Sequence, residues 1–118
     1  MSKSSLKSAA GNVDQLMAEK SGALTKAQAF ATMGLHETAQ PLWIAAAGFE
    51  ERIASILDAN GKLQEAGVHR ISAASCYQKA GDPSKTTNLF RAALAGPLRD
   101  VNRKEVEAML AECLSKLQ

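Results

Sequence analysis

The sequence contains one pattern twice, and the two copies lie 47 residues apart. When the segment that begins at Ala23 is aligned with the one that begins at Arg70, glycine falls on glycine, alanine on alanine and aromatic on aromatic. The matched positions are Ala27 with Ala74, Phe30 with Tyr77, Gly34 with Gly81, Leu42 with Leu89, Trp43 with Phe90, and residues 45–46 with 92–93. Internal repetition over this length is typical of stacked helical hairpins, which generally present a binding surface.

The composition favours helices over strands. The chain has 118 residues, which is enough for one domain with a hydrophobic core. Hydrophobic residues make up 46% of it but aromatic residues only 4%, so alanine supplies much of the apolar content. Alanine, leucine, lysine, glutamate and glutamine are strong helix formers, and no run of β-branched residues indicates a strand. We therefore predict an all-α protein.

Hydrophobic periodicity and turn residues divide the chain into five expected helices. Residues 1–11 are small and polar and are expected to form a flexible N-terminal tail, followed by a single helical-repeat domain over 12–118. The helices are expected over about 12–33, 37–59, 63–80, 83–95 and 102–117, joined by short turns into an antiparallel stack. The last helix is amphipathic and is expected to cap the core, with a partner's groove as the alternative place for it. Its apolar face consists of Val106, Met109, Leu110, Cys113, Leu114 and Leu117.

Local signals set these boundaries. Asn12 is expected to cap the first helix within a capping box. Pro41 is expected in the first turn of the second helix, where a missing N–H costs little. Asp82 followed by Pro83 marks the start of the fourth helix. Gly48 interrupts the apolar period of the second helix, so we predict one long helix and keep a bend at Gly48 as the alternative.

Within each copy, the spacing of small and aromatic residues resembles a tetratricopeptide (TPR) hairpin. That family places a small residue, an aromatic and a glycine in the first helix and its turn, then a small residue, an aromatic and an alanine in the second helix. These are Ala27, Phe30, Gly34, Ala39, Trp43 and Ala46 in the first copy, and Ala74, Tyr77, Gly81, Thr86, Phe90 and Ala93 in the second. The resemblance covers about residues 23–97 and implies two TPR-like hairpins plus a C-terminal capping helix.

Two features depart from the TPR pattern. The TPR unit repeats about every 34 residues. These copies are 47 residues apart, so the second helix is expected to be extended. Thr86 also stands where the family usually has alanine. A HEAT-like pair of hairpins, whose period matches this spacing, is therefore the alternative architecture.

The TPR resemblance implies a concave surface lined by the first helix of each hairpin. The lining positions are Ser21, Leu24, Gln28, Ala31 and Thr32 in the first copy, and Val68, Ile71, Ser75, Gln78 and Lys79 in the second. The candidate partner-binding residues among them are Gln28, Thr32, Ser75, Gln78 and Lys79. The lysine and asparagine clamp of the chaperone-binding members is absent, so the expected groove is mildly polar and suits a peptide or a helix. The alternative is that these positions pack within the stack.

The residue types needed for catalysis, metal binding or cofactor binding do not occur at productive spacings. Neither His36 nor His69 has a histidine or cysteine four residues away, so no metal site is expected. Both cysteines lie among apolar helical neighbours and are interpreted as buried free thiols without a nearby base. Residues 50–52 are charged, but adjacent residues on a helix point in different directions, so we place them on a solvated face. Trp43 is interpreted as a core residue because it aligns with Phe90.

The charge balance does not select a class of partner. The chain has 14 basic and 12 acidic residues, for a net charge of +2. The largest basic cluster surrounds the turn at 96–102 and is interrupted by acidic residues, with no aromatic residue expected beside it for base stacking. A nucleic-acid-associated regulator that uses this patch is the alternative function. The patch consists of Arg91, Arg99, Arg103 and Lys104.

The main prediction is a non-catalytic module for protein–protein interaction, acting as an adaptor or scaffold. Its expected partner is another protein or peptide, or a second copy of the chain, because two repeats leave apolar ends exposed. The sequence shows no secretory signal and no apolar run long enough to span a bilayer. No membrane partner is expected, and the cytoplasm is the expected compartment.

Overall fold

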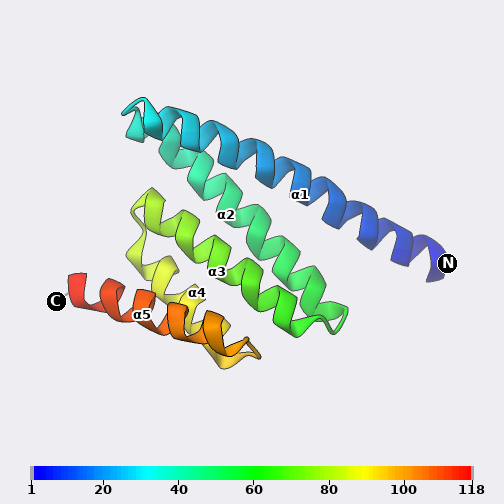
Figure 1. The fold of residues 1–118 in the computed structure, drawn as a ribbon. Helices are drawn as coiled ribbons and strands as arrows, with labels where there is room; N and C mark the ends of the chain where they lie inside the picture. The colour runs from blue at the N-terminus through cyan, green and yellow to red at the C-terminus, as the bar shows by residue number, and fades with distance from the viewer. Residues whose placement is uncertain (1, 118) are drawn as a thin grey trace.

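Five helices stack in chain order over residues 2–117, the part of the chain that the computed structural model describes (Figure 1). They are α1 (Ser2–Thr32), α2 (His36–Ala59), α3 (Leu63–Ala80), α4 (Pro83–Ala95) and α5 (Asp100–Lys116). Side chains are described from residue 12 onward. Consecutive helices run antiparallel, and each packs against the next along the chain. The predicted all-α antiparallel stack of about five helices is confirmed.

Most of the predicted boundaries are confirmed. Helices α3 and α4 begin and end at the predicted residues. Helix α2 continues through Gly48 as one helix of 24 residues, as predicted. The side chain of Asp82 accepts a hydrogen bond from the Lys85 amide at 3.1 Å, and Pro83 follows it in the first turn of α4, so the expected N-cap is present.

Two predicted details at helix starts are wrong. Helix α1 begins at Ser2, so Asn12 lies inside the helix and does not cap it. Pro41 lies inside α2 beyond its first turn, because that helix begins at His36. The expected flexible tail over 1–11 falls on residues whose side chains lie outside the described part of the chain, and it stays a prediction.

The first three turns of the stack share one backbone geometry. Each contains a glycine in the left-handed region, with φ of +79° at Gly34, +76° at Gly61 and +83° at Gly81. In each turn, the amide after the glycine bonds to a carbonyl five residues back, which satisfies the end of the preceding helix. These bonds run from Leu35 to Phe30 at 2.8 Å, from Lys62 to Leu57 at 2.8 Å and from Asp82 to Tyr77 at 2.9 Å.

Threonine at position 86 fits a site where the aligned residue is alanine. The side chain is fully buried, like that of its counterpart Ala39. Its hydroxyl donates to the backbone carbonyl of Asp82 at 2.7 Å. The buried polar atom is therefore paired, which removes the main cost of placing a hydroxyl in the core.

Several core residues that the repeat aligns are buried alike in the two hairpins. Ala27, Ala74 and Ala46 have no exposed surface, and Ala93 and Phe90 are 1% and 0% exposed. Trp43 is 5% exposed and belongs to the core formed by α1, α2 and α3, as predicted for it. A large aromatic on the second helix of each hairpin thus packs against small residues on the first.

Helix α5 covers the second hairpin. Val106 and Cys113 of α5 are buried with Ala74 of α3 and Phe90 of α4 in one cluster. Met109 and Leu110 pack against the same cluster, as does Leu98 in the preceding turn. Most of the apolar face of the last helix therefore lies against its own chain, whereas Leu117 is 54% exposed.

Two glycine substitutions are expected to change stability in opposite directions. A Cβ at Gly48 would meet no atom within 4 Å, so Gly48→Ala is expected to raise the free energy of unfolding. The gain is about 0.5–1 kcal/mol, because alanine loses less backbone entropy in a helix. Gly81→Ala also meets no atom, but φ of +83° strains an L-residue, so a loss of about 1 kcal/mol is expected. Denaturant unfolding of both variants measures the difference; a Gly81→Ala protein as stable as the wild type contradicts this account of the turn.

Candidate functional site

The five predicted binding residues do not form one groove. Gln78 and Lys79 are adjacent on α3 but point to different neighbours. The Gln78 amide donates toward the Cys113 sulfur of α5 at 3.6 Å. The Lys79 ammonium lies 4.5 Å from the centre of a Trp43 ring on α2. Each of the two residues therefore borders a different side of α3.

Two separate hollows lie beside these residues. A hollow of about 300 Å³ between α3, α4 and α5 is lined by Gln78, Gly81, Asp82, Pro83, Thr86, Cys113, Lys116 and Leu117. A second, of about 240 Å³ between α2 and α3, is lined by His36, Glu37, Gln40, Lys79, Ala80 and Gly81. Gln28 and Thr32 are exposed near the end of α1, and Ser75 is half-buried in α3. The assignment of these five residues to partner binding stays a prediction.

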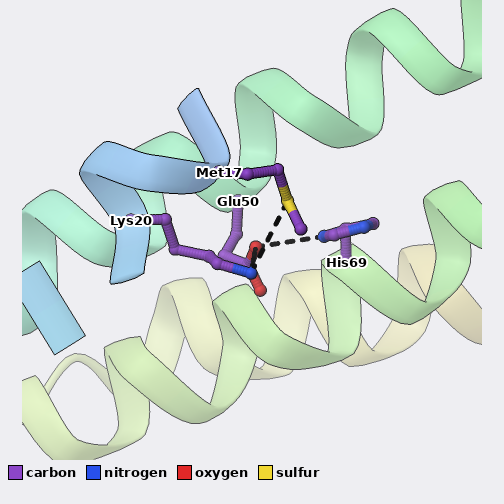
Figure 2. Close-up of polar contacts among 4 residues, drawn as sticks. All are labelled: Met17, Lys20, Glu50 and His69. Atoms are coloured by element: carbon purple, nitrogen blue, oxygen red, sulfur yellow. Dashed lines mark hydrogen bonds and ion pairs between the residues drawn. The ribbon is translucent and has the colours of Figure 1, made fainter. Parts of the chain in front are cut away.

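A buried carboxylate joins the first three helices (Figure 2). Glu50 of α2 is 2% exposed, and side chains from both neighbouring helices contact its Oε1 atom. The Lys20 ammonium of α1 lies 3.4 Å from this oxygen, and the His69 Nδ1 of α3 lies 3.0 Å from it. The Met17 sulfur lies 3.7 Å from the same ammonium. One oxygen atom thus connects three consecutive helices.

The surroundings of Glu50 favour its charged form. Burial by itself would raise the pKa of this carboxyl. The hydrogen bond from His69, the charge of Lys20 and the Ser72 hydroxyl outweigh burial, so the pKa lies below its ordinary value of 4.5. Glu50 is therefore ionised at neutral pH even though it lies in the core.

The prediction that residues 50–52 lie on a solvated face is wrong for Glu50 and Glu51. Glu50 is buried, and Glu51 is half-buried and accepts a hydrogen bond of 2.6 Å from the Tyr77 hydroxyl. Only Arg52 is exposed. The signal that could have located Glu50 is its register, since it lies three or four residues from Ala46, Ala47, Ile53 and Ala54 on the apolar face of α2.

Neighbouring groups on α3 are held in their neutral forms. Burial, together with the negative charge of Glu50, raises the pKa of the Cys76 thiol to about 11. Burial and the hydrogen bond to Glu51 raise the pKa of Tyr77 to about 12. The nucleophilic form of a cysteine is the thiolate, so Cys76 is a poor nucleophile at neutral pH.

The Glu50 cluster has the properties of a structural ion pair. The Ser72 hydroxyl, like Lys20 and His69, acts on the Glu50 carboxylate and lowers its pKa. Among the described residues, no group of three His, Cys, Asp or Glu side chains could hold a metal ion. The geometry instead fastens α1 and α3 to the middle of α2.

One residue of the predicted basic patch has a structural role. The two terminal nitrogens of Arg103 donate to the carbonyls of Leu94 and Gly96, each at 2.9 Å. These carbonyls end α4, so Arg103 ties the start of α5 to the end of α4. Arg91, Arg99 and Lys104 remain exposed. The patch therefore offers fewer free cations than its sequence indicates.

A third hollow lies between α1 and α2 and was not predicted. It has a volume of about 530 Å³. Its lining combines polar and apolar side chains: Asn12, Gln15, Leu16 and Glu19 of α1, and Arg52, Ser55 and Ile56 of α2. Arg52 also lies over the ring of Phe49, with 5.5 Å between the guanidinium carbon and the ring centre. A surface of this kind can receive a side chain or a helix from a partner.

No known protein family, curated protein or solved structure matches this chain. Across the described residues, none of the helices combines the length and the hydropathy required to cross a bilayer.

Loss of the Glu50 charge is expected to destabilise the protein in a pH-dependent way. Glu50→Gln should lower the free energy of unfolding by about 1–3 kcal/mol at neutral pH, because Lys20 and His69 lose the buried negative charge that pairs with them. Because the native pKa lies below 4.5, this stabilisation is complete above 4.5 and is lost as the pH falls through the lowered native value. Denaturant unfolding of both proteins between pH 7 and pH 3 should therefore show the difference shrinking in acid.

The control for this experiment is Glu112→Gln. Glu112 pairs with Lys116 at 3.3 Å, but its side chain is 65% exposed, so its loss should change stability little at any pH. A constant difference between Glu50→Gln and the wild type across the whole range would contradict the assigned charge state.

Removal of Arg103 is expected to loosen the contact between α4 and α5. Arg103→Ala should lower the free energy of unfolding by about 1–2 kcal/mol, because two helix-terminal carbonyls lose charged donors. Lys104→Ala, next to it and exposed, is the matched control and should unfold like the wild type. Equal stability of the two variants would contradict a structural role for Arg103.

Proposed function

We propose that this chain is a non-catalytic protein–protein interaction module, an adaptor or scaffold built from two TPR-like hairpins and a capping helix. The partner is another protein or peptide, and the module acts in the cytoplasm. Stacked hairpins of this kind expose long helical surfaces, which suit the recognition of a partner helix or peptide.

The observation that carries the proposal is the equivalence of the two hairpins. The turns at Gly34 and Gly81 have the same backbone conformation and the same closing hydrogen bond. The aligned core residues, among them Trp43 and Phe90, are buried alike. A chain with two equivalent hairpins has two equivalent sets of helix surfaces, and each is available for binding unless another helix covers it.

The unusual period of the repeat is compatible with this proposal. Helix α2 has 24 residues and α4 has 13, so the extra length of α2 accounts for most of the difference from the TPR period. A HEAT-like pair of hairpins remains the alternative description. Either architecture supports the same role, because both families use stacked helices as binding surfaces.

The nucleic-acid alternative has less support. Its patch is interrupted by Asp100 and Glu105, and Arg103 is engaged with the end of α4. A phosphate-binding surface depends on several free cations, and its affinity falls steeply with salt. Protein binding that survives moderate salt would separate the two functions.

The proposal is tested by affinity purification of the tagged full chain from its native cell after nuclease treatment. We expect a discrete protein to be retained at moderate salt and identified by mass spectrometry, with the tag alone as control. Recovery of the bait alone, or a retained fraction that disappears with nuclease, would contradict a protein-interaction role.

A further inference from the structure

Helix α1 forms one end of the stack and packs against α2 on one of its sides (Figure 1). On another side of α1, exposed residues recur every three or four positions, which is the spacing of a contact surface between antiparallel or parallel helices. We call these residues the α1 face. They are Gln15, Glu19, Gly22, Lys26, Ala29 and Met33.

The charges of the α1 face are complementary to themselves. Glu19 and Lys26 lie seven residues apart, two turns along one side of the helix, and the midpoint between them follows Gly22. Among the described residues, neither charge has an ion-pair partner. When a second α1 lies antiparallel across this midpoint, the Glu19 of each copy faces the Lys26 of the other. A parallel contact would place like charges together, so the charges select the antiparallel arrangement.

The same arrangement brings an exposed apolar side chain to an open groove. Met33 is 68% exposed at one end of the face, and the groove of about 530 Å³ between α1 and α2 begins at Asn12, towards the other end. Asn12 and Met33 are equally far from the midpoint that pairs the charges, so the Met33 of each copy lies at the groove of the other. Leu16 and Ile56 supply apolar walls for the flexible methionine side chain.

Small residues near the midpoint let the two helices approach each other. A Cβ placed on Gly22 would meet no atom of its own chain within 4 Å, so this side of α1 is open at its centre. Ala29, one turn beyond Lys26, is also small and exposed. The distance between packed helices depends on the side chains at the contact, so glycine and alanine bring the opposite charges within reach of each other.

The other end of the stack does not offer a matching surface. Helix α5 covers the second hairpin through the cluster that contains Phe90 and Val106. Copies of the chain therefore lack the complementary pair of ends that head-to-tail joining requires. A two-fold contact needs only one face, used by both copies, and it closes at two chains.

We propose that the chain forms a two-fold symmetric dimer through the α1 face, with the two α1 helices antiparallel across Gly22 and the Met33 of each copy in the groove of the other. This inference goes beyond the proposed interaction function, because it assigns one surface to a second copy and leaves the other helix surfaces to a different partner.

Analytical ultracentrifugation of the purified full chain tests the dimer. With rising concentration, we expect the mass to increase from the 12.5 kDa of one chain to twice that value. Added salt should weaken the dimer, because the paired charges lie at the surface. A mass that stays at one chain up to about 1 mM, the range of very weak complexes, would overturn the proposal.

Exchange of the two charges tests the antiparallel pairing. Lys26→Glu sets acid against acid and Glu19→Lys sets base against base, so each variant should raise the Kd of the dimer by about tenfold or more. An equimolar mixture of the two variants should dimerise again, since every acid then faces a base. Thermal unfolding checks that both variants keep the fold.

The matched control for the charge exchange is Lys104→Glu, the same change at an exposed position of α5, which should dimerise like the wild type. An unchanged Kd for Lys26→Glu, or a mixture that fails to restore the dimer, would contradict the pairing of Glu19 with Lys26.

Crosslinking locates the two-fold axis. Gly22→Cys places two thiols beside the axis, so a short bismaleimide should join the two chains. Gln28→Cys, six residues along and therefore on a different side of the helix, should not be joined. The native cysteines are buried, and the wild type treated in the same way measures their contribution. Equal crosslinking at positions 22 and 28 would contradict this contact.

The outcomes are distinct from those of the proposed function. If the chain stays monomeric but affinity purification retains a different protein, the interaction function stands and the dimer is wrong. If the dimer forms but purification recovers only the bait, the dimer stands and the adaptor function is wrong.

Discussion

The stack depends on how closely its helices can approach one another. Alanine makes up more than half of the buried apolar residues in the described chain, and several of these alanines have no exposed surface at all. Small side chains at the crossing points bring the backbones together and leave room for an aromatic residue on the second helix of each hairpin, Trp43 or Phe90. A larger side chain at Ala27, Ala46 or Ala74 would separate the helices, and overpacking of this kind typically costs about 1–3 kcal/mol.

In a core of small side chains, the few larger and polar groups contribute a larger share of the stability. Alanine buries little apolar area, so each aromatic ring contributes disproportionately to the hydrophobic free energy. The Glu50 cluster adds what alanine cannot, a directional contact that defines the register of α1 and α3 on α2. A buried ion pair is weak evidence for added stability but is well suited to excluding alternative registers. Such a contact opposes the sliding of alanine-rich helix faces past each other into a different register.

The fold was largely predictable from the sequence because its boundaries are local. Gly34, Gly61 and Gly81 adopt the left-handed conformation, and Asp82 followed by Pro83 is a local signal for the start of a helix. The Glu50 cluster was missed because its members come from three helices and meet only in the tertiary structure. The separation of Gln78 from Lys79 was missed for a related reason, since the neighbours of α3 decide which hollow each residue borders. The start of α1 was misplaced because a good capping residue also tolerates a position inside a helix.

Helix α5 makes the two ends of the stack different from each other. Repeats that offer complementary surfaces at both ends join head to tail, and such joining produces filaments unless it closes into a ring. By covering the second hairpin, α5 removes one of the two complementary ends. The surface against which a third hairpin would pack is therefore already buried by the seventeen-residue helix of the chain itself.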